Sequence, residues 1–412
     1  MDKKWFIFIE SNTTGTGLLY AKSAAENGFI PVLFTNDTSQ YRMFRENDIK
    51  IMRINTFDEN LLFDACMYFD SGLGVAGISS SSEYFIKVAA RLAKRLGLPS
   101  PAPSAIEVCG NKYLQYQSLQ LKGVRTPKSI LIESIYEFNL DEEWQLPVIV
   151  KPVQGSGSVG VKLCRSITEV RDHLNLLLTR ENNERGIPAL KKALVQEYIK
   201  GDEYSVEIFN GKAIGITKKI LCIPPDFVET GHDFPAELPS GQEYKIREFA
   251  EKSVEILDLK WGPIHVEVRY DKHGPVMIEV NPRLAGGYIP KLVQYAMNIN
   301  LIDETIKLAT GLHCGTYNKI SGSRYASIRF IIPRTEGMLS AIKGVDAAKK
   351  APGITEVSFY RAVGDYLQIH GDFRDRIGHV ISVSSSSTEA SNGVEDAKAS
   401  IILDIKKEDI AS

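Results

Sequence analysis

The sequence is poor in cysteine, in long apolar runs and in clustered charge, and each shortage excludes a class of protein. Its 412 residues include five cysteines without a CxxC pair, namely Cys66, Cys109, Cys164, Cys222 and Cys314. This spacing disfavours a disulfide framework or a zinc site and favours small buried thiols in a reducing compartment. The apolar run WFIFI is too short for a signal peptide, and no segment approaches membrane-spanning length. We therefore expect a cytoplasmic protein that does not enter a membrane.

The charge of the chain is nearly balanced. Its formal net charge is −2, without a basic block or a Lys/Arg run interleaved with aromatic residues. Nucleic acid is therefore not an expected partner. Hydrophobic residues make up 43% and charged residues 24% of the chain, which is ordinary for a soluble globular protein. The length predicts two or three domains.

The N-terminal region has the pattern of a parallel βαβ unit, with strands predicted at residues 4–9 and 29–35 around a helix at 18–27. Gly15-Thr16-Gly17, with Asp37 about twenty residues later, forms half of a dinucleotide fingerprint, but Tyr20 stands in the place of the third glycine. The unit continues with a helix at 59–69, a strand at 74–78 and a helix at 84–96. Loops 12–16 and 79–83 follow strands, so they either touch a substrate or are solvated turns.

The segment GLPSP at residues 97–101 breaks this pattern and marks a domain boundary. Beyond it we predict one helix from Ser104 to about Leu121, with Glu107 completing a capping box. Lys112 would then lie in mid-helix.

A glycine-rich loop, KPVQGSGSVGV at residues 151–161, follows the apolar strand predicted at 146–150. Its backbone amides and serine hydroxyls can wrap phosphate oxygens, and Lys151 supplies a positive charge. The loop is not a Walker loop, because no Gly-Lys-Ser/Thr opens a helix. The alternative is a flexible hairpin tip.

Residues 265–287, HVEVRYDKHGPVMIEVNPRLAGG, predict a β-hairpin, because two alternating segments flank the turn cluster DKHG. A three-residue loop, residues 272–274, would set Glu267 across from Glu279. A two-residue loop would set it across from Ile278. We predict the three-residue loop.

This register places two carboxylates opposite each other on a face that also carries Met277 and, two residues on, the Asn281 amide. Facing carboxylates destabilise a sheet unless a cation lies between them. Three hard oxygen donors suit Mg²⁺ or Mn²⁺ bound together with substrate phosphates. The alternative is an exposed hairpin whose acids face water.

The remaining segments predict further strands, helices and loops. Residues 190–199 predict a strand whose end, QEYI, offers main-chain groups to a flat heterocycle, and GDEYSVE at 201–207 turns back into another strand. Residues 227–235, FVETGHDFP, predict an irregular loop that holds Glu229 and His232. Helices are predicted at 242–257 and 301–310, C-terminal strands at 326–332, 354–359, 366–370 and 379–384, and a loop at 384–393.

The order of these blocks resembles the ATP-grasp superfamily over about residues 1–330. The resemblance rests on the lysine-bearing helix, Lys-Pro with the glycine-rich loop, QEYI with GDEYSVE, and Glu267 followed by EVNPR at 279–283. It implies an α/β and α+β multidomain chain, with an ATP-grasp fold behind a Rossmann-like pre-ATP-grasp domain and before a β-rich C-terminal cap. The domains implied are residues 1–100, 101–200 and 201–322, with the cap at 323–412.

The resemblance also implies roles for single residues. ATP would be bound by Lys112, Lys151, Gly155, Ser156, Gly157, Ser158, Gly160, Glu197, Ile199 and Glu203, with adenine at the backbone of Glu197 and Ile199 and ribose at Glu203. Glu267, Glu279 and Asn281 match the magnesium ligands, and Arg283 matches the arginine that stabilises the transition state.

Within the superfamily, ETGH at 229–232 and NPRLAGG at 281–287 resemble the bacterial L-amino acid ligases, which join two unprotected amino acids. In those ligases a glutamate and a histidine spaced like Glu229 and His232 border the amino-acid site. Some carry a bulky residue where this chain has Gly287. The implied reaction is phosphorylation of one amino acid by ATP to an aminoacyl phosphate, which the amine of the second then attacks. Arg283 and His232 would act in catalysis, and these two with Glu229 and Gly287 would bind substrate.

Two alternatives remain open. A carboxylase-type ATP-grasp enzyme would make carboxyphosphate from bicarbonate, and the cap is compatible with it. A sensor would bind ATP without turnover, although the intact set of Lys, Glu, Asn and Arg argues against this. The identity of the amino acids, and whether the chain is a monomer or a homodimer, cannot be read from the sequence.

Overall fold

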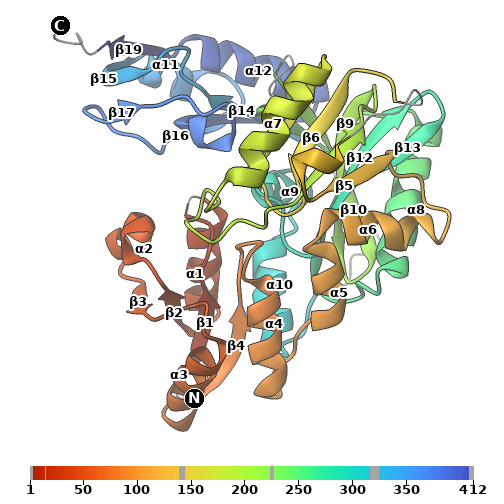
Figure 1. Cartoon of the computed structure of the whole chain (residues 1–412). Helices are drawn as coiled ribbons and strands as arrows, with labels where there is room; N and C mark the ends of the chain where they lie inside the picture. The colour runs from red at the N-terminus through yellow and green to blue at the C-terminus, as the bar shows by residue number, and fades with distance from the viewer. Residues whose placement is uncertain (1–2, 14, 139–143, 223–226, 316–323, 408–412) are drawn as a thin grey trace, which may run out of the picture.

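The computed structural model describes residues 3–13, 15–138, 144–222, 227–315 and 324–407 (Figure 1). Four regions follow one another along the chain, and the last of them, drawn in blue, lies at the opposite end of the molecule from the N-terminus. The domain boundary expected at residues 322–323 lies outside the described residues.

The N-terminal region is a parallel sheet with helices on both faces. Its strand order is β3-β2-β1-β4, from β1 (Trp5–Ile9), β2 (Ile30–Thr35), β3 (Lys50–Arg53) and β4 (Val75–Ser79). Side chains alternate along β1, so Phe6 and Phe8 join one core with α1 (Thr16–Glu26), and Ile7 and Ile9 join another. α3 (Glu59–Ser71) and α4 (Ile86–Arg95) cover the second face. The predicted parallel unit is confirmed, whereas β3 and the short α2 (Arg42–Glu46) were not predicted.

The helix predicted from Ser104 to Leu121 is wrong, because two helices occupy this segment. α5 (Pro103–Cys109) ends at Gly110, and Asn111 caps α6 (Lys112–Gln120) by accepting from the backbone amides of residues 113 and 114. The predicted capping box is absent, since Ser104 lies inside α5. Lys112 is therefore the first residue of a helix, and its backbone amide donates to Val153 O (3.1 Å) at the start of the glycine-rich loop.

A small antiparallel sheet precedes the large one. Its order is β5-β8-β6-β7, from β5 (Ser129–Ile132), β6 (Val148–Pro152), β7 (Lys162–Cys164) and β8 (Ala193–Glu197). Helix α7 (Ile167–Thr179) packs on it through Val170, Leu174 and Leu177. The glycine-rich loop connects β6 to β7.

An eight-stranded sheet runs through the C-terminal half in the order β13-β12-β9-β10-β11-β14-β18-β16. Its first five strands are β9 (Asp202–Phe209), β10 (Lys212–Leu221), β11 (Glu229–Phe234), β12 (Pro263–Asp271) and β13 (Gly274–Asn281). α8 (Ser240–Ile256) covers one face, while α9 (Ile289–Met297) and α10 (Leu301–Ala309) share a core with the N-terminal region. Residues 229–234 are thus a strand, and the irregular loop predicted there is wrong.

The cap continues this sheet with β14 (Tyr325–Ile331), β16 (Ile354–Phe359) and β18 (Gly378–Ser384). A second sheet joins β15 (Gly337–Lys343), β17 (Tyr366–Leu367) and β19 (Ile402–Lys406). Helices α11 (Val345–Lys350) and α12 (Ser387–Ala399) share one hydrophobic core with strands of both sheets. The loop predicted at 384–393 is wrong over most of its length, because Ser386 caps α12 by accepting from the Glu389 amide.

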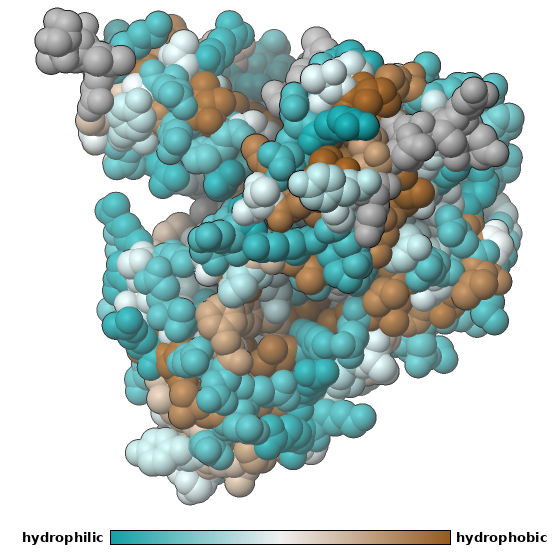
Figure 2. Space-filling model, in the orientation of Figure 1, coloured by the Kyte–Doolittle hydropathy of each residue, from teal (hydrophilic) through white to brown (hydrophobic). Residues whose placement is uncertain are grey.

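Among the helices of the described residues, none is both long and apolar enough to cross a bilayer. Figure 2 shows hydrophilic and hydrophobic residues interspersed over the face that carries the cap and the N-terminal region.

Candidate active site

A cleft of about 890 Å³, partly open to solvent, lies between the small antiparallel sheet and the eight-stranded sheet. Most residues predicted to bind nucleotide, metal or substrate line it, namely Lys112, Lys151, Gly155, Ser156, Gly157, Ser158, Glu197, Ile199, Glu203, Glu229, Glu267, Glu279, Asn281 and Arg283. Gly160, His232 and Gly287 do not line the cleft. The structure therefore brings together residues that are up to 171 positions apart, from Lys112 to Arg283.

Glu267 and Glu279 are direct partners across the β12–β13 hairpin, as predicted. The three-residue loop that was predicted to produce this pairing is wrong. The strands close at Asp271 and Gly274 around a two-residue turn, and a β-bulge between Glu267 and Val268 then restores the pairing of the two glutamates.

The bulge also corrects the predicted faces of β13. Met277 pairs with Val268 and is fully buried in the core, whereas Ile278 lines the cleft beside Glu279. Helix α6 contacts this distortion, because Tyr116 Oη donates to Ile278 O (2.6 Å) and Gln115 exchanges two hydrogen bonds with the Val280 backbone (2.8 and 2.9 Å).

Glu279 lacks full compensation for its charge. Lys112 Nζ lies 2.9 Å from its Oε1, yet burial, together with Glu83 and Glu267, raises the pKa of Glu279 above its ordinary value. Asn281 lies beside it, and its amide nitrogen can donate to Glu279 Oε1 (3.2 Å) and to Glu83 Oε2 (3.3 Å). A buried carboxylate with a raised pKa favours a further cation at this point.

The donor set fits magnesium only together with a ligand. Among the described residues no group of three or more His, Cys, Asp and Glu side chains is arranged to hold a metal ion. Two carboxylates and an amide are hard oxygen donors, and Mg²⁺ is commonly held by one or two carboxylates plus substrate phosphates. Glu267, Glu279 and Asn281 therefore fit a metal ion that phosphate oxygens help to hold.

Two buried lysines border the glycine-rich loop. Lys112 Nζ donates to Gly155 O (2.7 Å), and Lys151 Nζ donates to Tyr116 Oη (2.8 Å). Burial and the neighbouring Lys112 lower the pKa of Lys151 to about 8. Two closely spaced cations with few anionic partners suit phosphate oxygens.

A third lysine, Lys219 of β10, was not predicted and lies at the centre of the cleft. Its Nζ contacts Glu203 (2.9 Å), Glu229 (2.6 Å) and Glu267 (3.0 Å). Burial alone would lower the pKa of Lys219, but the three carboxylates raise it well above its ordinary value. The alternating pattern of β10 gives no signal that distinguishes this lysine from Lys218, which faces solvent.

One end of the cleft is apolar. Ile149 and Phe227 belong to one buried cluster, and Tyr198 and Leu221 pack against it. At this end Arg269 donates to Ile199 O (2.8 Å) and to Glu203 Oε2 (2.9 Å). Apolar walls beside backbone carbonyls suit a flat heterocycle, and Glu203 is held by two cations.

Glu229, the anion predicted to meet the amino acid, also lines the cleft, and we call its surroundings the amino-acid end. Lys219 contacts one of its oxygens (2.6 Å), and Arg376 of the cap contacts the other (2.8 Å). Burial would raise the pKa of Glu229, but these cations hold it well below its ordinary value. Arg376 was not predicted, because nothing in the sequence links the cap to residue 229.

His232 lies beyond Glu229 and is fully buried. Neither ring nitrogen has a hydrogen-bond partner, and Nε2 is 3.6 Å from Glu229 Oε2. Burial lowers the pKa of His232 to about 3, so the ring is neutral. A Cβ on Gly287, whose φ is +59°, would lie 2.5 Å from Nε2. The observed position of His232 therefore requires glycine at residue 287.

Arg283 lies between the cleft and the N-terminal region. Its Nη2 donates to Glu83 Oε2 (2.6 Å), and Glu83 belongs to the serine-rich segment after β4. Loop 79–83, one of the two expected to touch a substrate, thus reaches the cleft. Glu83 was not among the predicted site residues.

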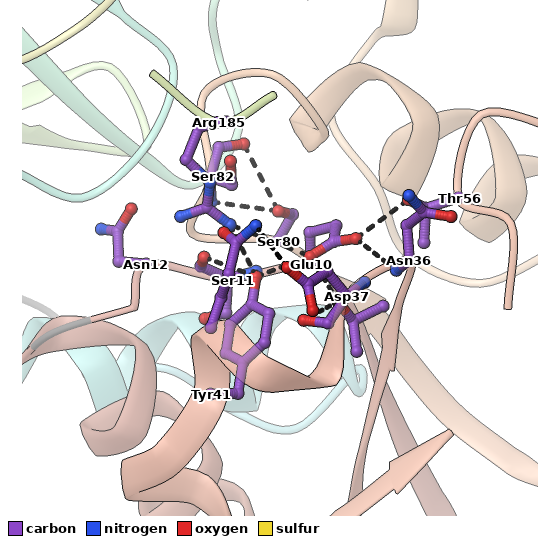
Figure 3. A network of polar contacts seen from close by, with 12 residues as sticks. Glu10, Ser11, Asn12, Asn36, Asp37, Tyr41, Thr56, Ser80, Ser82 and Arg185 are labelled. Carbon is purple, nitrogen blue, oxygen red and sulfur yellow. Dashed lines mark hydrogen bonds and ion pairs between the residues drawn. The ribbon is translucent and has the colours of Figure 1, made fainter. Parts of the chain in front are cut away.

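A second polar network joins the N-terminal region to the segment before β8 (Figure 3). Buried Glu10 accepts from the Tyr41 hydroxyl (2.6 Å) and the Thr56 hydroxyl (2.9 Å). Arg185 reaches this network and donates to Tyr41 Oη (2.8 Å). We call residues 180–188, which include Arg185, the strap.

Asp37, part of the half fingerprint, caps a 3₁₀ turn by accepting from Ser39 N (2.9 Å) and from the side chains of Ser39 and Gln40. Its carboxylate is thus occupied by its own turn. The fingerprint has no further support in the structure.

Comparison with known proteins supports the same interpretation. Residues 144–291 match the family model of the ATP-grasp domain, and residues 329–406 match that of L-amino acid ligase C-terminal domain 2. The protein y4rH of Sinorhizobium fredii is 34% identical over 400 residues, which cover 97% of this chain and 82% of that protein. Dapdiamide A synthase of Enterobacter agglomerans is 24% identical over 292 residues, or 66% of each chain.

The fold has a counterpart among solved structures. The crystal structure of L-amino acid ligase from Bacillus licheniformis matches with a TM-score of 0.84 at 20% sequence identity, covering 99% of this chain and 100% of that chain. At 20% identity this match shows a shared fold.

Proposed function

Because this chain belongs to the ATP-grasp superfamily and is an ADP-forming carboxylate–amine ligase, we propose that it joins two unprotected amino acids into a dipeptide. The observation that supports this most is the meeting of two sets of groups in one cleft. Lysines, the glycine-rich loop and paired glutamates lie at one end, and Glu229 with a residue of the cap lies at the other. The cap is of the L-amino acid ligase type, which favours this reaction over bicarbonate activation.

The first step we propose is phosphorylation of the first amino acid's carboxylate by ATP. Lys112, Lys151 and the amides of residues 155–158 bind and orient the phosphates, and Ile199 and the apolar walls hold the base. ATP-grasp enzymes use ATP with Mg²⁺. Magnesium, when bound by Glu267, Glu279 and Asn281 with the phosphates, offsets the charge of the transferred phosphoryl group.

In the second step the amine of the second amino acid attacks the aminoacyl phosphate, and phosphate leaves. Arg283 is fixed by Glu83 and stabilises the developing oxyanion. The attacking amine must lose a proton. His232 is fully buried, does not line the cleft and has a pKa lowered to about 3, so we assign it a role in positioning Glu229, whose Oε2 lies 3.6 Å from its Nε2.

The test is phosphate release with ATP and Mg²⁺ across all pairs of the common amino acids, with the product masses determined. We expect ADP, phosphate and a dipeptide for certain pairs, and no release with ATP alone. Phosphate release that requires bicarbonate and ignores amino acids would replace the proposal with a carboxylase. ATP binding without turnover under every condition would replace it with a sensor. The need for ATP and the five cysteines, which form no disulfide in the described part of the chain, support a cytoplasmic location.

A further inference from the structure

Arg376 of the cap contacts Glu229, which lines the cleft, and only 11% of the Arg376 side chain is exposed. Its Nη2 donates to Glu229 Oε2 (2.8 Å), and its Nε donates to the Glu229 carbonyl (3.2 Å). The guanidinium lies 3.9 Å from the centroid of the Phe330 ring. Stacking on an aromatic face and a two-point contact fix the plane of this cation.

One edge of the guanidinium remains unused. The contacts to Glu229 employ Nε and Nη2, and Nη1 donates to none of the described residues. A guanidinium fork presents five N–H donors and matches a carboxylate with two parallel hydrogen bonds. The Nη1 and Nη2 edge of Arg376 can therefore accept a second carboxylate while Nε keeps its contact with residue 229.

The segment that carries Arg376, which we call the cap turn, residues 370–376, is rigid. Buried Asp375 accepts from the backbone amides of His370 (2.7 Å) and Gly371 (2.8 Å). Asp372 accepts from Arg374 N (3.0 Å) and from its guanidinium (2.6 and 2.8 Å). A turn held at so many points presents the next side chain in one orientation, which lowers the entropy cost of binding.

The cap turn contacts the nucleotide end of the site as well. Gly157 of the glycine-rich loop lies so close to the Phe373 ring that a Cβ there would meet a ring atom at 2.4 Å. The same short turn thus touches both the loop expected at the phosphates and the glutamate expected at the amino acid.

Arg376 and Lys219 contact different oxygens of Glu229. Lys219 is the one of the two that also contacts Glu203 and the expected metal ligand Glu267. A carboxylate that is to be phosphorylated must lie toward the metal and phosphate groups, beside Arg283. A carboxylate at Arg376 would keep its charge through the reaction.

We propose that Arg376 binds the free carboxylate of the second amino acid, the one whose amine attacks. This assignment rests on the proposed dipeptide-forming function, in which one substrate carboxylate reacts and the other must be held without reacting. A zwitterion at this end would meet Glu229 with its ammonium group before deprotonation and Arg376 with its carboxylate. The second substrate is thereby restricted to amines that carry a carboxylate.

The experiment compares the wild type with Arg376→Met and Arg376→Lys. Arg374→Met is the matched control, because it removes a cation of the same turn while the backbone hydrogen bonds to Asp372 and Asp375 that hold the turn remain. Two assays separate the two steps. Hydroxylamine in place of the second amino acid traps the aminoacyl phosphate as a hydroxamate and reports the first step. Dipeptide formation with alanine or alaninamide as the second substrate reports the use of its carboxylate.

We expect Arg376→Met to keep hydroxamate formation within about threefold of the wild type. Its preference for alanine over alaninamide, expressed as a ratio of kcat/KM values, should fall by at least about tenfold, since a charged two-point contact is lost. Comparing this ratio between the variant and the wild type cancels the difference in amine basicity between the two substrates. Arg376→Lys should lose part of the preference, because a point charge replaces a fork, and Arg374→Met should keep it.

Two results would overturn the assignment. If Arg376→Met or Arg376→Lys lowers hydroxamate formation and both dipeptide reactions in equal proportion, Arg376 serves only as a partner of Glu229. If the wild type itself forms no hydroxamate with any amino acid, the proposed function fails and this assignment fails with it. Melting temperatures of all variants show whether Arg376→Met folds, and Arg376→Lys carries the test where it does not.

Discussion

Lys219 shows how single residues set the charge balance of this cleft. Three carboxylates converge on one ammonium group that is 3% exposed, and His265 adds a second cation between Glu207 (3.0 Å) and Glu267 (3.1 Å). Burial would lower the pKa of His265, but these two glutamates raise it to about 9. The charge of Glu267 is therefore compensated by two cations, whereas that of Glu279 is compensated only in part, by Lys112.

This difference makes Glu279 the more informative position for a metal test. Burial and the neighbouring carboxylates raise the pKa of Glu279, so its negative charge contributes little to the stability of the fold. Glu279→Gln keeps the size of the side chain but removes a hard anionic donor. We predict a fall in kcat of at least about a hundredfold with a melting temperature within a few degrees of the wild type.

The matched control is Glu243→Gln, which removes a half-exposed carboxylate whose one ion pair among the described residues is with Arg247 (2.9 Å), one helical turn away. It should leave kcat unchanged. Near-normal activity of Glu279→Gln at limiting Mg²⁺ would show that the cation site is elsewhere.

His232 predicts a pH dependence of stability. Its pKa is about 3 in the folded protein and about 6.5 in an unfolded chain, so below pH 6.5 only the unfolded state gains the proton. The free energy of unfolding should therefore fall as the pH drops from 6.5 toward 3, by about 1.4 kcal/mol per pH unit from this residue alone. Above pH 7 the residue contributes no slope.

Urea unfolding at pH 7 and pH 5 measures this effect. The wild type should lose about 2 kcal/mol more than His232→Gln between these two values, because the glutamine does not titrate and all other groups are shared. Equal losses in the two proteins would mean that His232 is not buried as a neutral ring.

At the residue scale the sequence predicts the groups whose spacing is local and misses those whose partners are distant. Glu267, Glu279 and Asn281 belong to one hairpin, which the local sequence indicates. Lys219 and Arg376 meet Glu229 only through the packing of separate strands and the cap. No pattern within either segment distinguishes these cations from ordinary surface residues.

At the element scale, the length of the β12–β13 turn could not be predicted from its residues. The cluster DKHG indicates a turn but does not fix its length, and the bulge at Ile278 depends on hydrogen bonds from Gln115 and Tyr116 in another helix. A bulge sustained by tertiary contacts cannot be derived from the two strands that contain it. The correct pairing of the glutamates was thus obtained for a wrong reason.

At the same scale, we make a prediction about the order of the glycine-rich loop. Its described contacts to the rest of the molecule include Lys112 to Gly155 O and Phe373 beside Gly157, so phosphate should add most of its order. We predict that amides of residues 151–160 exchange hydrogen at least about tenfold more slowly with Mg²⁺ and a non-hydrolysable ATP analogue.

The turn at Lys272 and His273 is exposed and serves as an internal control, since its exchange should not change. Phe373→Ala should speed exchange in the loop before nucleotide is added. Equal protection of the loop with and without the analogue would remove its role at the phosphates.

At the scale of the whole molecule, the strap ties the small antiparallel sheet to the N-terminal region. Arg185 contacts Tyr41 (2.8 Å) and Glu10 (3.8 Å), and Tyr84 donates to Glu184 Oε1 (2.7 Å). Arg185→Met should release the strap, raise amide exchange in residues 180–188 by about tenfold and lower kcat/KM for ATP by about threefold to tenfold.

Arg165→Met is the matched control, because Arg165 lies in the same region and its side chain is exposed. It should change neither quantity. If Arg185→Met leaves strap exchange at the wild-type rate, the network in Figure 3 stabilises the N-terminal region alone and does not hold the two parts together.

The pairing of β11 with β14 has a consequence for building hybrid enzymes. A cap transplanted from a relative would have to reproduce the register from Gly231↔Arg329 to Phe234↔Ala326 as well as the contact from Arg376 to Glu229. A breakpoint chosen at the apparent start of the cap would divide one sheet between two parents. A mismatched graft would leave β11 as an open edge, which invites aggregation. Recombination should therefore carry β11, β14 and the cap turn from the same parent, so that substrate choice and solubility are inherited together.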